Sequence, residues 1–68
     1  MTAKTLERIK QANLNIYMNI ISLKKWHNSE TVNHDCSLAE IRGFLTGLVL
    51  TGFISEQEKK VIFCYITL

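Results

Sequence analysis

The 68-residue sequence contains no proline, no internal repeat and no low-complexity tract. Nothing in it therefore indicates a linker between domains, and we expect residues 1–68 to form a single small helical domain. A domain of this size buries only about 60% of the surface of its unfolded chain. Its hydrophobic core is marginal unless a further interaction adds to it.

Cysteine and long apolar runs are also scarce. Cys36 and Cys64 allow at most one disulfide, and the N-terminal MTAKTLERIK is not followed by the apolar region of a signal peptide. The longest apolar stretch, residues 47–54, is too short and too interrupted by Thr and Gly to span a bilayer. We therefore expect a reduced, cytoplasmic protein without a membrane partner.

The excess of positive charge is small: the sequence has eight Lys and Arg and six Asp and Glu, for a formal net charge of +2. This permits an acidic partner or nucleic acid, but it falls short of the strongly basic surface of most nucleic-acid-binding domains. Apolar residues, in contrast, make up 47% of the chain. That fraction is high for a small domain, which has much surface to cover, so we predict a homodimer.

The spacing of apolar residues predicts an all-α fold with three helices, at about 5–27, 38–51 and 56–67. The polar run NSETVNHDC at 28–36 is a loop, because its Asn, Ser, Thr and Asp side chains compete with the helix backbone. It joins the first two helices as a helical hairpin, and the third helix follows.

Asn13 interrupts the apolar arc of the first predicted helix, between Ile9 and Ile16. Two interpretations remain open from the sequence. Asn13 is either a buried residue bonded to a neighbour, or a residue that fixes the register between paired helices.

The stretch SLAEIRGFLTGLVLTGFIS contains signals for helix starts and stops. Ser37 and Glu40 match a capping box, in which the hydroxyl and the carboxylate satisfy backbone N–H groups at a helix start. Gly52 follows the last apolar turn, where a left-handed residue ends many helices. Ser55 and Glu58 repeat the capping box and start the third helix.

Residues 61–68, VIFCYITL, are rich in β-branched and aromatic side chains, so a short strand is an alternative to a helix there. We favour a helix because the capping box starts one and because no partner strand is evident elsewhere. In either conformation this apolar segment must be buried.

Small residues recur every four positions on the second predicted helix. Two glycines inside a helix cost about 1 kcal/mol each relative to alanine, so they require a reason. A groove of small residues lets another helix approach closely, and that helix belongs either to the same chain or to a second copy. The predicted self-association surface consists of Ala39, Gly43, Gly47, Phe63 and Ile66.

The only soft metal ligands are His27, His34, Cys36 and Cys64. Their spacing matches no zinc module, so buried cysteines and surface histidines without a metal are the simpler interpretation. Cys36 with His34 lacks the orienting group and the pocket of a nucleophilic site. We therefore predict a non-enzymatic protein without a cofactor.

A small DNA-binding regulator is the alternative function. Helix 38–51, the Gly52 turn and helix 56–67 have the length of a helix-turn-helix. The polar residues available for base contacts are few, however, namely Arg42, Gln57, Lys59 and Lys60. Four further residues are candidates for contacts with a partner, with the Trp as a hot spot if it is exposed: Arg8, Lys24, Lys25 and Trp26.

The segments TLERIK, NHDC and AEIRGFLTGLVLTGFISEQE resemble the short accessory proteins encoded in the early exo–xis region of lambdoid bacteriophages. The resemblance covers most of the chain but carries no catalytic motif and no transferable site residues. It implies a small helical phage protein, made early, that influences the choice between lysis and lysogeny by binding a host or phage protein. It also implies action in the cytoplasm of the host cell.

Overall fold

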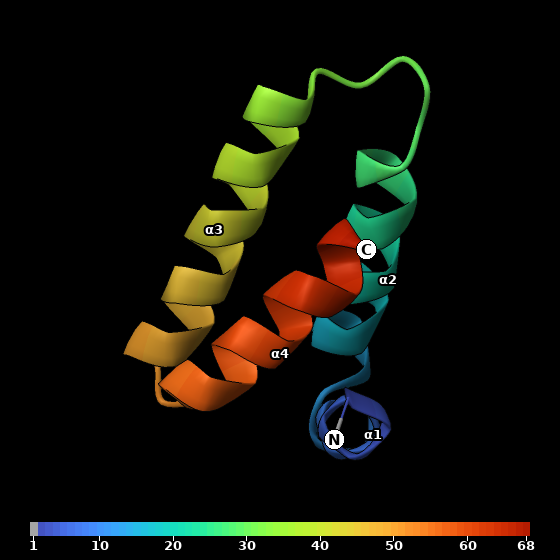
Figure 1. Cartoon of the computed structure of the whole chain (residues 1–68). Helices are drawn as coiled ribbons and strands as arrows, with labels where there is room; N and C mark the ends of the chain where they lie inside the picture. The colour runs from blue at the N-terminus through green and yellow to red at the C-terminus, as the bar shows by residue number, and fades with distance from the viewer. Residues whose placement is uncertain (1) are drawn as a thin grey trace.

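The computed structural model describes residues 2–68 and is all-α, as the sequence predicts. The C-terminal segment, for which a short strand was the alternative, is helical as far as Thr67. No strand occurs in the described part of the chain. The four helices of this part are α1 (Thr2–Ala12), α2 (Leu14–His27), α3 (His34–Leu50) and α4 (Glu56–Thr67) (Figure 1).

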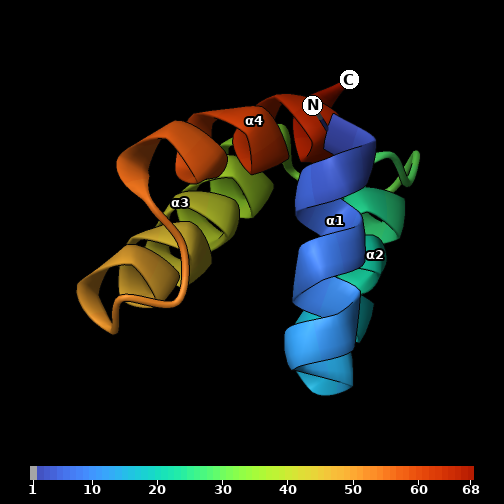
Figure 2. The ribbon, with the colours of Figure 1, turned by 90° about the horizontal axis from the view of Figure 1, so that it is seen from below.

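Helices α2 and α4 each contact all three of the other helices, whereas α1 and α3 contact only these two. Helix α4 closes the arrangement. It crosses the opening between α2 and α3 in Figure 1, and Figure 2 shows it running across one end of α1. The radius of gyration is 11.4 Å, close to the roughly 11 Å of a compact chain of this length.

The predicted single helix at 5–27 is wrong, because the chain turns at Asn13 and forms two helices. Asn13 has extended backbone angles (φ −158°, ψ 101°), and its side-chain Oδ1 accepts the N–H of Ile16 at 3.1 Å. Both interpretations of Asn13 fail, since the residue is exposed and serves as the N-cap of α2. Asparagine is among the best N-cap residues because its oxygen satisfies an N–H that lacks a helical partner.

Helix α3 also begins earlier than predicted. Asn33 is its N-cap, and the Asn33 side-chain Oδ1 accepts the N–H groups of Asp35 and Cys36 at 2.9 and 3.2 Å. The predicted capping box of Ser37 and Glu40 is therefore wrong, and Ser37 lies buried inside the helix.

The turn between α3 and α4 has the predicted form. Gly52 adopts a positive φ of 79°. The N–H of Phe53 donates to the carbonyl of Leu48 at 3.0 Å, and that of Gly52 donates to Val49 at 2.9 Å. These two bonds form a Schellman motif, which satisfies the last carbonyls of α3.

One hydrophobic core joins all four helices. Helices α3 and α4 each contribute two fully buried apolar side chains to it, and α1 and α2 contribute one each. The buried apolar residues are Ile9, Ile20, Ile41, Leu45, Leu48, Ile54, Ile62 and Ile66.

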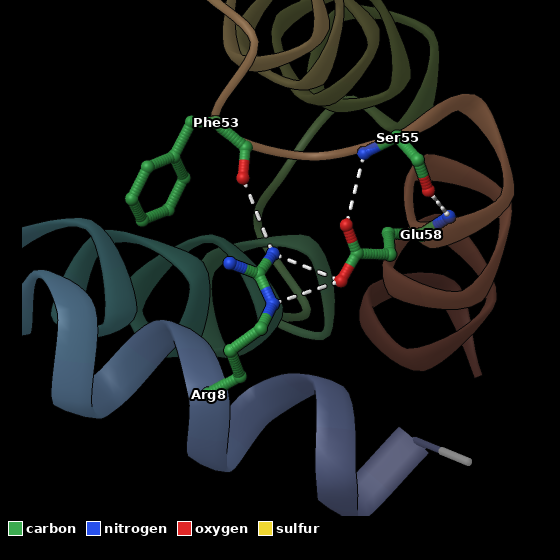
Figure 3. Close-up of polar contacts among 4 residues, drawn as sticks. All are labelled: Arg8, Phe53, Ser55 and Glu58. Carbon is green, nitrogen blue, oxygen red and sulfur yellow. Dashed lines mark hydrogen bonds and ion pairs between the residues drawn. The ribbon is translucent and has the colours of Figure 1, made fainter.

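Glu58 connects the start of α4 to α1 (Figure 3). The predicted capping box is confirmed: Ser55 Oγ accepts the N–H of Glu58 at 3.1 Å, and Glu58 Oε1 accepts the N–H of Ser55 at 2.9 Å. The other carboxylate oxygen, Oε2, pairs with Arg8 Nη2 at 2.8 Å. Arg8 Nη2 also donates to the carbonyl of Phe53 at 3.2 Å.

Lys24 of α2 makes the corresponding connection at the other end of α4. Its Nζ donates to the carbonyl of Tyr65 at 2.7 Å and lies 4.6 Å from the centroid of the Tyr65 ring. A cation is favourable at this position because the last carbonyls of a helix carry partial negative charge. Basic side chains of α1 and α2 thus fix both ends of α4.

The Glu58 carboxyl has a lowered pKa, chiefly because the Ser55 N–H donates to it and further because Arg8 lies beside it, although partial burial opposes the shift. A carboxyl whose pKa is lower in the folded than in the unfolded state stabilises the fold above its unfolded pKa. This contribution disappears as the pH falls through the folded pKa.

We expect Glu58→Gln to keep the capping bonds and to lose the ion pair. The free energy of unfolding at neutral pH should fall by roughly 0.5–1 kcal/mol, and the loss should shrink toward zero in acid. Urea titrations across the acidic range measure this difference. Glu56→Gln, an exposed residue of the same turn, is the control. An equal pH dependence in both variants would contradict the proposed contribution of Glu58.

Candidate functional site

A buried polar cluster connects the end of α2 to the first turns of α3. His27 Nδ1 lies 2.6 Å from Ser37 Oγ, and the Ser37 hydroxyl donates to the carbonyl of His34 at 3.1 Å. Because that hydroxyl has a single proton, His27 Nδ1–H donates to Ser37. The His27 and His34 rings stack with centroids 4.8 Å apart. This cluster joins two helices and leaves its buried polar atoms paired.

The histidines and cysteines do not converge on a metal site. Within residues 2–68, no three His, Cys, Asp or Glu side chains are grouped closely enough to hold an ion. The expected burial pattern is also wrong, since Cys36 and Cys64 are exposed whereas His27 is buried. His27 is buried because its hydrogen bond to Ser37 satisfies the ring nitrogen, and the cysteines lie on the outward faces of α3 and α4.

The outer face of α3 is a continuous strip of small and apolar residues, here called the glycine face: Ala39, Gly43, Gly47 and Leu50. All four residues are exposed, and Leu50 has 81% of its surface accessible. A Cβ atom placed on Gly43 or Gly47 would meet no atom within 4 Å. The interpretation that a helix of the same chain fills the small-residue groove is therefore wrong.

The five residues of the predicted self-association surface do not lie together. Ala39, Gly43 and Gly47 share the glycine face, whereas Ile66 is fully buried in the core and presents no surface. Phe63 is half-buried on α4, with the Arg42 guanidinium 5.6 Å from its ring centroid. The contiguous exposed strip thus belongs to α3 alone.

A second surface, here called the basic groove, lies between α3 and α4 and has a volume of about 510 Å³. Three cations and one aromatic ring line it. Its residues are Arg42 and Thr46 of α3, and Lys59, Lys60, Phe63 and Cys64 of α4. The i, i+4 spacing places Lys59 beside Phe63 and Lys60 beside Cys64 on the surface of α4. The sequence predicted these cations only as possible base contacts of a helix-turn-helix. It did not predict the groove, because only the packing of α3 on α4 brings Arg42 to the two lysines.

The four candidate partner contacts fall into two groups. Arg8 and Lys24 are engaged within the chain, at Glu58 and at Tyr65. Lys25 and Trp26 are exposed, with 40% of the Trp26 surface accessible. Trp26 lines a smaller groove of about 330 Å³ between α2 and α3, together with Asn19, Ser22, Leu23, Glu40 and Phe44.

No helix within residues 2–68 combines the length and the apolar character that a bilayer crossing requires.

We expect Ser37→Ala to lower the free energy of unfolding by about 1–3 kcal/mol, because it leaves the buried His27 N–H without an acceptor. Ser37→Asn should be destabilising as well, since the larger side chain overfills a buried site. Asparagine would be tolerated if Ser37 were an N-cap. Urea titration measures both variants, and Ser22→Ala, at an exposed serine of α2, is the control. A neutral Ser37→Asn would contradict the observed packing.

Comparison with known proteins finds no family model that matches the sequence. It also finds no significant similarity to a curated protein or to a solved structure. Functional conclusions therefore depend on the exposure, contacts and charges of this chain's own residues.

Proposed function

We propose that the chain is a non-enzymatic interaction protein, which forms a homodimer and binds another protein. The glycine face is the observation that carries this proposal. Gly43 and Gly47 each cost α3 about 1 kcal/mol relative to alanine, and open space surrounds both of them. Nothing in the monomer requires glycine at these positions, whereas a second helix lying against them would.

A second copy of the chain is the partner that fits this face. Two α3 helices related by a twofold axis present the same strip to each other, so a self-complementary contact forms without any additional element. Small residues allow the two backbones to approach closely, as they do in membrane helix pairs. Leu50, at the end of the strip, would lose its exposure to water in the dimer, which favours association.

The basic groove and the Trp26 groove stay available for a different protein. Trp is the residue type most enriched at interface hot spots, and Trp26 lines its groove with 40% of its surface accessible. The resemblance to early lambdoid phage proteins extends the proposal, with a host or phage protein as the partner and the lysis–lysogeny choice as the process affected. Affinity capture from a bacterial lysate, with the full chain as bait, identifies such a partner.

A DNA-binding regulator is the second candidate, and the clustering of Arg42, Lys59 and Lys60 favours it. One observation opposes DNA binding: the later turns of α4 bury Ile62 and Ile66 in the core. Only the first turn of α4 is then left for base contacts. DNA binding predicts an affinity that falls steeply with salt, because phosphate contacts release counterions. An absence of any duplex shift at low salt would remove this candidate.

Substitutions of Gly43 and Gly47 by alanine and by leucine test whether the glycine face is a dimer interface or a surface that contacts no partner. We expect Gly43→Ala and Gly47→Ala to stabilise the monomer by up to about 1 kcal/mol each, because alanine favours the helix. Gly43→Leu and Gly47→Leu should leave the monomer folded, since there is open space around both positions, and should prevent dimer formation by keeping the helices apart. Circular dichroism measures folding, and sedimentation velocity measures the oligomeric state.

The control for these variants is Gln57→Leu, which adds the same side chain at an exposed position of α4 outside the glycine face. This variant should dimerise like the wild type. A wild-type protein that sediments as a monomer at every concentration, or leucine variants that still dimerise, would contradict the proposed interface.

A further inference from the structure

The basic groove contains three positive side chains that form no ion pair within residues 2–68. Arg42, Lys59 and Lys60 line it, and none of its six lining residues is acidic. Within residues 2–68 the one ion pair is that of Arg8 with Glu58, so these three cations have no carboxylate partner there. By contrast, Arg8 and Lys24 each donate a hydrogen bond to a backbone carbonyl.

Bringing three positive side chains to one groove has a cost, because like charges that lie close together repel each other. The repulsion is weak in water and grows where low-polarity walls exclude solvent. A ligand that carries negative charge removes this repulsion and gains attraction from each cation. The groove is therefore electrostatically matched to an anionic ligand.

The wall of the groove is apolar despite the charges at its edge. Phe63 is half-buried within it, Cys64 and Thr46 add small side chains, and the lysines contribute their methylene stems. The Arg42 guanidinium lies 5.6 Å from the centroid of the Phe63 ring. A guanidinium held over a ring has lost part of its side-chain freedom, and it retains planar N–H groups that can bind a carboxylate in bidentate fashion.

We propose that the basic groove binds a short acidic segment of a partner protein. In the bound segment, carboxylates meet Arg42 and the Lys59–Lys60 pair, and an apolar side chain between them packs on Phe63. This inference rests on the proposed function as an interaction protein and names the chemistry of its ligand. An acidic peptide fits better than a DNA duplex, because the bases of a duplex are stacked inside the helix and leave no apolar group for the wall at Phe63. The net charge of +2 also provides little long-range attraction for a polynucleotide.

Fluorescence anisotropy with defined probes tests this proposal. The first probe is a short labelled peptide in which Glu and Asp alternate with Leu and Phe. The second replaces each acid by Gln or Asn, and the third is a labelled DNA duplex. We expect the wild-type chain to bind the acidic peptide at least ten-fold more tightly than the amide peptide or the duplex, with an affinity that falls as salt rises.

Charge reversal locates the binding site on the chain. Arg42→Glu with Lys59→Glu should weaken binding of the acidic peptide at least ten-fold. The control, Lys4→Glu with Lys10→Glu, changes two exposed lysines outside the groove and gives the same net charge, so its affinity should stay within about two-fold of the wild type. Equal losses in both double variants would overturn the groove assignment and indicate non-specific attraction.

Cys64 provides a second measurement that does not depend on the charge variants. It is an exposed thiol that lines the groove, and in Cys36→Ser it is the only thiol of the chain. Bound acidic peptide should slow alkylation of Cys64, whereas the amide peptide should not. Absence of both binding and protection, equal binding of the amide peptide, or tighter binding of the duplex would each overturn the proposal.

Sedimentation of the same variants keeps this proposal separate from the proposed dimer. The groove variants should retain the oligomeric state of the wild type, because their substitutions lie outside the glycine face. Peptide binding by a monomer would contradict the dimer alone. A dimer that does not bind the acidic peptide would contradict the groove assignment alone.

Discussion

The Glu58 carboxylate makes two connections at once, one within α4 and one to α1. One oxygen completes the capping box with Ser55 and the other pairs with Arg8 of α1, so the residue that starts α4 also fixes its position. Lys24 holds the opposite end at the carbonyl of Tyr65. Between these two points α4 directs Ile62 and Ile66 into the core.

The packing of α2 and α4 leaves one face of α3 uncovered. A small chain has enough apolar surface for a single core, and α3 packs only against α2 and α4, each of which contacts all three of the other helices. Helix α3 therefore buries Ile41, Leu45 and Leu48 on one face and leaves its opposite face in solvent. The glycine face and the basic groove are both consequences of this arrangement, which is why the functional proposals concentrate on α3 and its border with α4.

Local signals in the sequence predicted the features that depend on neighbouring residues only. The all-α class, the Gly52 turn, the Ser55–Glu58 box and the helical tail are of this kind, since each is formed by residues within a few positions of one another. The two asparagine caps show the limit of this reasoning. Asn13 and Asn33 each start a helix, but Asn13 lies within a regular apolar spacing and Asn33 is followed by a second plausible cap at Ser37. Periodicity and cap preference conflicted at these two places, and in both the side-chain amide oxygen capped the helix.

The candidate surfaces depend on how distant helices pack, and the sequence predicted them only in part. It singled out Gly43 and Gly47 but left open whether a helix of the same chain covers them, and the open space around them excludes that possibility. It grouped Ile66 with them, although Ile66 completes the core. The roles of Arg8 and Lys24 in holding α4, and the meeting of Arg42 with Lys59 and Lys60, have no local signal. Each of these contacts joins residues of two different helices.

The distance between two spin labels tests most directly whether the glycine face joins two chains. Cys36 is exposed at the start of α3 and lies on the same side of the helix as Gly43 and Gly47, so in Cys64→Ser it carries a single nitroxide beside the interface. Two α3 helices that cross between Gly43 and Gly47 place the two Cys36 Cα atoms no more than about 30 Å apart, given a rise of 1.5 Å per residue. A narrow distance distribution in this range, lost in Gly47→Leu, is the predicted result. A sample with no intermolecular distance, or with one that persists in Gly47→Leu, would contradict the interface.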